Sequence, residues 1–118
     1  MSGDISRRII VKGGERMADI GQPMSEAAFY ILLALLKPSH GYSMMARISE
    51  LSKGRVHMGP GTLYGALTRM KKEGLIELES QDDRRKTYVI TDLGKQTLYA
   101  EYERLKTMVF DAAVLEEG

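Results

Sequence analysis

The residues of this chain that could do chemistry lie on one face of the segment from Pro60 to Glu73. Its hydroxyl-bearing and cationic members are Thr62, Tyr64, Thr68, Arg69, Lys71 and Lys72. Hydroxyls can donate to phosphates or base edges, and cations neutralise phosphates, so this face has the chemistry of a nucleic-acid reader. Gly61 joins this candidate set, and Gly65 lets another backbone approach closely. The structural alternative is that Gly65 only permits tight helix packing and that Tyr64 is a half-buried core residue.

Local signals predict a helix over Pro60 to Glu73 that presents this face. Gly59 can act as N-cap, and Pro60 suits the first helical position because no N–H is needed there. Gly74 supplies a left-handed residue just past the end. The apolar members of the segment are Leu63, Ala66, Leu67 and Met70. Their spacing of i, i+3, i+4 and i+7 gathers them on the opposite side, where they would join a core.

A second cationic cluster follows in a predicted β-hairpin. Residues 75–79 and 86–90 alternate apolar and polar side chains, which is typical of strands with one face on a core. The tip cations are Arg84, Arg85 and Lys86. Adjacent positive charges at a hairpin end suit contact with duplex phosphates. Because Asp82 and Asp83 stand beside them, a solvated turn with local charge compensation is the alternative.

The other segments complete the order of elements. Further helices are predicted over 25–36, 42–51 and 92–115, with a turn at 38–41 and a short strand at 56–58. Three helices followed by a hairpin form a winged helix-turn-helix, whose third helix enters the major groove. The predicted fold class is mainly α with a small β-hairpin, a winged helix-turn-helix plus a long C-terminal dimerisation helix. The predicted domains are a flexible N-terminal extension (1–22), the DNA-binding domain (23–91) and the dimerisation helix (92–118).

The last helix carries an apolar seam that a single small domain would not need. Its members are Leu98, Tyr102, Leu105, Val109 and Ala112, spaced by 4, 3, 4 and 3 residues. The first helix is apolar nearly all round, so it needs cover on several sides, and Phe29 on it joins the dimerisation residues. Both features predict a homodimer.

Composition narrows the function classes. The 118 residues carry a net charge of +1, but residues 1–91 hold +4 and residues 92–118 hold −3, so the basic excess lies with the reading helix. The chain has no cysteine, and His40 and His57 have no third ligand near them in sequence, so we expect no metal, cofactor or enzyme active site. The longest apolar run has ten residues, too few to span a bilayer, and we expect a cytoplasmic protein without a membrane partner.

The first 22 residues mix charges, glycines and a few aliphatic residues without a sustained period. We interpret them as a flexible extension upstream of the domain. The alternative is a basic arm in which Arg7, Arg8 and Lys12 contact DNA phosphates.

Several motifs, in order and spacing, resemble those of the PadR family of bacterial transcriptional regulators. They are Ala28-Phe29-Tyr30-Ile31-Leu32, His40-Gly41-Tyr42, Gly61-Thr62-Leu63-Tyr64-Gly65-Ala66-Leu67, Glu73-Gly74-Leu75-Ile76, and Arg84-Arg85-Lys86 leading into Tyr88 and Thr91. The resemblance runs from about Ser25 to Ala112. It implies a homodimer joined through the last helix, usually with help from the first, that represses transcription from a pseudo-palindromic operator. The short C-terminal part resembles the small subgroup with one long dimerisation helix.

By the same resemblance, Tyr42, Thr62 and Tyr64 should lie at DNA together with the hairpin cations. Family members that sense drugs stack flat aromatic ligands on a tryptophan of the last helix, and this chain has no tryptophan. Tyr102 or Leu105 occupies that region, and with Tyr30 they form the candidate pocket for a small aromatic or apolar effector. The alternative functions are a winged-helix protein-interaction module without DNA binding and, more weakly supported, a carrier or enzyme for small aromatic compounds.

Overall fold

The computed structural model describes residues 8–10, 16–19 and 22–117. Strands β1 (Arg8–Ile10) and β2 (Arg16–Asp19) pair antiparallel near the N-terminus. No strands are expected there from the sequence, because such short segments show no alternation and their pairing depends on the partner strand. Arg7 and Lys12 of the alternative basic arm lie outside the described residues, as do the other residues of the predicted extension 1–22 apart from these two strands and Gln22.

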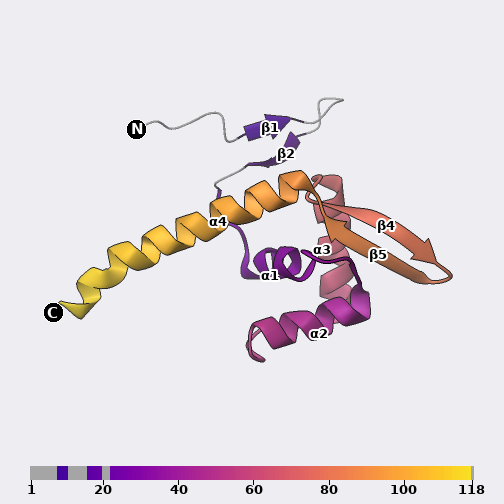
Figure 1. The fold of residues 1–118 in the computed structure, drawn as a ribbon, viewed down its shortest axis with the longest axis horizontal. Helices are drawn as coiled ribbons and strands as arrows, with labels where there is room; N and C mark the ends of the chain where they lie inside the picture. Colours follow the sequence, from indigo (N-terminus) through magenta and orange to yellow (C-terminus); the bar gives the residue numbers. More distant parts are fainter. Residues whose placement is uncertain (1–7, 11–15, 20–21, 118) are drawn as a thin grey trace.

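The predicted helices all form, with ends shifted by a few residues. They are α1 (Glu26–Ala34), α2 (Gly41–Leu51), α3 (Pro60–Lys72) and α4 (Asp92–Asp111), and a short 3-10 helix, η2 (Ala112–Glu116), follows α4. The hydroxyl of Ser25 caps α1 by accepting from the N–H of Ala28 at 3.1 Å. Gly74 takes the expected left-handed backbone, with φ of 81°, and ends α3. In Figure 1, α4 starts beside α3, runs past α1 and projects well beyond the other helices.

A three-stranded antiparallel sheet corrects the expected hairpin. Its strands are β3 (Ser39–His40), β4 (Ile76–Asp82) and β5 (Arg85–Ile90), in the order β3-β5-β4. Residues 38–41 were predicted as a turn and 56–58 as a strand, yet Ser39 and His40 pair with β5 and residues 56–58 form no strand. A two-residue strand is too short to show the alternation by which strands are predicted from sequence. It forms because β5 has a free edge with which Ser39 and His40 can pair. The hairpin is also longer, because the turn is only Asp83 and Arg84.

The core lies where α1, α2 and α3 meet the sheet. Its largest fully buried side chains are Ile31, Leu32, Leu35, Met44, Ile48, Leu63, Leu67, Met70 and Ile76. The predicted apolar stripe of α3 is therefore confirmed, since Leu63 and Leu67 are buried together with Ala66 and Met70. With that stripe fixed against the core, the opposite face of α3 points outward and its side chains are exposed.

The first turn of α4 is tied tightly to the end of α3. The Thr91 hydroxyl donates to the Gly74 carbonyl at 2.6 Å, and the Thr91 N–H donates to the Leu75 carbonyl at 3.0 Å. A Cβ at Gly94 would lie 2.7 Å from Cγ1 of Ile90 and closer still to the Leu75 carbonyl oxygen. Gly94 therefore permits the close approach that sets the direction of α4. In the part of the chain that the structure describes, no helix is long and apolar enough to cross a bilayer.

Candidate nucleic-acid interface

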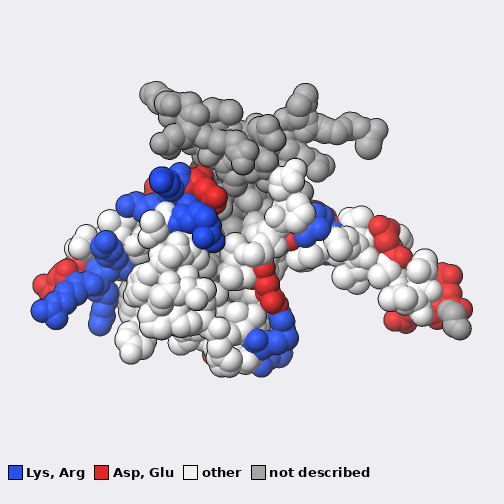
Figure 2. Space-filling view, turned by 180° about the vertical axis from the view of Figure 1, so that it is seen from behind, with Lys and Arg blue, Asp and Glu red and all other residues white. Residues whose placement is uncertain are grey.

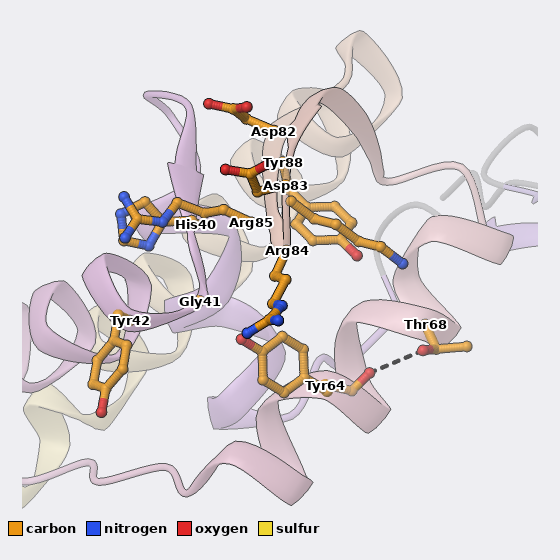
Figure 3. A pocket seen from close by; sticks show the side chains of 11 residues that line it. His40, Gly41, Tyr42, Tyr64, Thr68, Asp82, Asp83, Arg84, Arg85 and Tyr88 are labelled. Atoms are coloured by element: carbon orange, nitrogen blue, oxygen red, sulfur yellow. Dashed lines mark hydrogen bonds between the residues drawn. The ribbon is translucent and has the colours of Figure 1, made fainter.

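A groove of about 1220 Å³ runs between the start of α2, the outer face of α3 and the tip of the β4–β5 hairpin. It is lined by His40, Gly41, Tyr42, Tyr64, Thr68, Asp82, Asp83, Arg84, Arg85, Lys86 and Tyr88. Figure 3 shows these side chains converging from the junction of β3 and α2, from α3 and from the β4–β5 hairpin. The fold therefore brings three of the predicted reading residues, Tyr42, Tyr64 and Thr68, to one surface with all three tip cations.

The other predicted reading residues lie on α3 outside the lining of the groove. They are Gly61, Thr62, Arg69 and Lys71, and all four are exposed. A Cβ added at Gly61 or Gly65 would meet no atom within 4 Å, so the alternative of tight helix packing at Gly65 is wrong. Because Gly65 has no side chain, the outer face of α3 is recessed at this position and its backbone is accessible.

Tyr64 and Thr68 lie one turn apart on the groove side of α3. Tyr64 is 48% exposed, so it is not a core residue, although its phenol leans over Gly41. The hydroxyl of Thr68 donates to the Tyr64 carbonyl at 2.9 Å, which is the dashed line in Figure 3. Because that proton is engaged within the helix, Thr68 presents its methyl group and acceptor lone pairs outward.

The hairpin tip carries exposed cations beside exposed acids. Asp82 of β4 lies opposite Arg85 of β5 in the strand register, and Asp83 occupies the turn with φ of 55°. Among the residues that the structure describes, no ion pair joins Asp82 or Asp83 to a tip cation. In Figure 2 several Lys and Arg side chains lie at the hairpin, on the left, with acidic groups beside them, while the far end of α4, on the right, carries acidic groups. The charge asymmetry of the sequence is thus also a separation in space.

Tyr88 is a buried phenol that lines the groove; the sequence placed it in a strand and in a motif of the resemblance, but not among the site residues. It is 8% exposed, and burial raises the pKa of its phenol, with the neighbouring Tyr64 adding to the rise. Tyr88 therefore stays a neutral hydroxyl at ordinary pH. Gly41 was also missed as a site residue, although the His40-Gly41-Tyr42 motif had drawn attention to this turn.

The predicted dimerisation residues divide into two groups. Leu98 is only 6% exposed and packs in the chain's own core, so the seam must be corrected at this position. Tyr102 is 47% exposed and Val109 is 73% exposed, with Leu105 partly buried between them. Ala112 is exposed but belongs to η2, where the heptad spacing no longer applies. Phe29 is partly covered by the core and meets Tyr30 edge to face at 5.7 Å.

The three effector candidates do not share a described hollow. None of Tyr30, Tyr102 and Leu105 lines the groove or the smaller hollow of about 500 Å³ beside α2. The Tyr30 hydroxyl accepts from Nη2 of Arg55 at 3.1 Å, and Arg55 also forms an ion pair with Glu26. The ring of Tyr102 lies under the ammonium group of Lys106, 4.7 Å from its centroid.

The histidines contribute no metal site within the described residues. Nε2 of His40 lies 3.0 Å from the Ser43 hydroxyl, and His57 is exposed in the loop before α3. Residues 8–10, 16–19 and 22–117 contain no group of three or more His, Cys, Asp or Glu side chains that could hold an ion.

These features define a winged helix-turn-helix protein with an exposed reading helix and a cationic wing. The model of the transcriptional regulator PadR-like family matches residues 31–100, and the chain belongs to that family. The family is one of transcriptional regulators rather than of enzymes.

Relatives and solved structures agree with this membership. A 37.1 kDa protein in transposon TN4556 of Streptomyces fradiae is 35% identical over 97 residues, covering 79% of this chain and 28% of that protein. The transcriptional regulator YqjI of Escherichia coli is 28% identical over 95 residues, covering 80% of this chain and 45% of that protein. The chain thus spans less than half the length of these relatives.

Two solved structures of PadR-like regulators resemble the fold. The one from Bacillus cereus has a TM-score of 0.65 and 26% identity, covering 78% of this chain and 92% of that chain. The one from Bacteroides fragilis has a TM-score of 0.58 and 28% identity, covering 74% of this chain and 89% of that chain.

Proposed function

We propose that this PadR-like regulator binds a double-stranded DNA operator through α3 and the β4–β5 hairpin. The observation that carries the proposal is the shared groove, in which Tyr64 and Thr68 of α3 face the tip cations of the wing. With α3 in the major groove, its exposed face would meet base edges while the hairpin contacts flanking phosphates. Thr62, Arg69 and Lys71 extend this surface along α3 beyond the groove itself.

We also propose that the protein acts as a homodimer on a pseudo-palindromic operator. Support comes from the part of α4 that projects from the domain and carries exposed apolar side chains. They are Tyr99, Tyr102, Met108, Val109 and Phe110. So much apolar surface on one helix is typical of an interface, because single exposed apolar residues are common but continuous patches are not. Two copies joined there would present two α3 helices to half-sites about 34 Å apart.

Repression and a response to an effector complete the proposal. A bound dimer can block transcription by occupying the promoter, and a small aromatic or apolar compound near α1 and α4 would act by changing how the dimer holds its two reading helices. Tyr30, Tyr102 and Leu105 are the residues proposed for such a compound. This part rests on the family rather than on a hollow, and a screen for ligands that release the protein from DNA would test it.

Footprinting on the duplex upstream of the protein's own coding sequence is the direct test, because such regulators often control adjacent genes. We expect protection of two half-sites, and sedimentation should show a dimer in the absence of DNA. Loss of footprint with Thr62→Ala would support reading by α3. A stable dimer that protects no duplex would instead favour the protein-interaction module, for which the near-neutral net charge is the supporting observation.

A further inference from the structure

Tyr64 occupies the space that a side chain at position 41 would need. A Cβ built at Gly41 would lie 2.8 Å from Cζ of Tyr64 and closer still to its hydroxyl oxygen. Real carbon atoms do not approach that closely, so no residue with a side chain fits at position 41 while Tyr64 keeps its place. Gly41 is itself buried, as the first residue of α2 and part of the lining of the groove.

Glycine is favoured at position 41 because there is no room for a side chain, and not because of its backbone conformation. The positive-φ glycines in the described part of the chain are Gly54 and Gly74, and Gly41 has an ordinary backbone. Glycine at the start of a helix also carries an entropic cost relative to alanine. The absence of a side chain at Gly41 is therefore explained by its contact with Tyr64.

The obstacle at position 41 is the far end of a side chain that has room to move. Tyr64 is half exposed and faces the open groove, so its phenol can retreat without disturbing the core. Restoring ordinary van der Waals distance between an added methyl group and the Tyr64 hydroxyl requires a displacement of about 1.5 Å. An alanine at position 41 should thus leave the fold intact and push the phenol into the groove.

We propose that Gly41 is a positioning residue of the DNA interface: its missing side chain lets the phenol of Tyr64 rest against the first turn of α2. That contact sets where the Tyr64 hydroxyl meets the duplex. Tyr64 and Tyr88 of β5 both line the groove, so the Tyr64 phenol lies between the start of α2 and the wing. The inference rests on the proposed function, because it assigns a cause to the geometry of the same surface.

A double-mutant cycle tests the inference. The four proteins are the wild type, Gly41→Ala, Tyr64→Ala and the variant with both changes. Affinity is measured on the footprinted upstream duplex. Gly41→Ala should weaken binding by about tenfold in the wild-type background, the size of one displaced base contact, and by less than about twofold when Tyr64 is already alanine. Gly65→Ala is the matched control for folding, because its methyl group meets nothing in the chain and alanine suits a helix interior, so its melting temperature should not fall below that of the wild type.

A readout without DNA separates this inference from the proposed function. In proton NMR, nuclear Overhauser contacts should join the Gly41 α-protons to the Tyr64 ring, and Gly41→Ala should displace the ring signals while the rest of the spectrum stays folded. Missing contacts in the wild type would overturn the inference whatever the protein binds. An equal effect of Gly41→Ala in both backgrounds would overturn it too. A wild-type protein that shows these contacts but binds no duplex would refute the proposed function, and the positioning role with it.

Discussion

Replacing Arg84 and Arg85 together by alanine removes two exposed guanidinium groups from the hairpin tip and leaves the core untouched. Each cation–phosphate pair removed from a protein–DNA complex reduces the slope of log K against log salt by about 0.9. Because each protomer of a dimer is deprived of both guanidinium groups, we expect the slope to fall by about 3 to 4. Projected to physiological salt of about 0.15 M, the same change lowers affinity by up to about a thousandfold.

The assay is an anisotropy titration of a labelled duplex between about 50 and about 200 mM salt, where such slopes are well determined. Lys95→Ala is the control, since Lys95 is an exposed lysine on α4 and its replacement should leave the slope unchanged. Thermal unfolding should show both variants within about 0.5 kcal/mol of the wild type, as expected for surface substitutions. If the double variant kept both its affinity and its salt slope, the wing would not contact DNA and the reasoning from the groove would be refuted.

The remaining predictions concern assembly, packing and pH. Tyr102→Glu should give folded monomers in sedimentation, whereas Leu98→Glu should abolish cooperative melting because it buries a charge; a dimer that survives Tyr102→Glu would place the interface elsewhere. Gly94→Ala should cost about 1–3 kcal/mol in denaturant unfolding, since its methyl group would press on backbone, and an unchanged midpoint would contradict that packing. The Arg104 guanidinium, donating to both oxygens of Glu101, holds the pKa of that carboxyl below its ordinary value of 4.5. The pair therefore stabilises the fold fully above pH 4.5 and less as the pH falls through the lowered pKa. Arg104→Ala should raise the Glu101 pKa in an NMR titration, and an unmoved pKa would refute the assignment.

Much of the candidate site could be predicted from the sequence because α3 is specified locally. Pro60 and Gly74 mark its ends, and the apolar spacing from Leu63 to Met70 fixes which face is buried. Once that face is buried, the polar face must point outward. Cation positions at the tip were likewise readable, because a hairpin turn between two alternating strands projects its residues into solvent.

Other features depend on residues far apart in the chain. Strand β3 forms because Ser39 and His40 pair with the free edge of β5. Two residues are too few to show a strand pattern in the sequence. Leu98 fits a heptad seam by spacing, yet the docking of the first turn of α4 on Leu75 rotates it into the core. A pattern within one helix shows which residues share a face, and the neighbouring elements decide what covers that face.

The sequence by itself therefore determined the order of the elements, the outward face of α3 and the cations of the wing, since each depends on neighbours within a few residues. The tertiary structure decided which of these residues meet in one groove, where the projecting part of α4 begins, and which side chain occupies the space beside Gly41. Those outcomes are set by distances between segments more than twenty residues apart, such as Gly41 and Tyr64. Such contacts are a property of packing, and no local pattern in the chain encodes them.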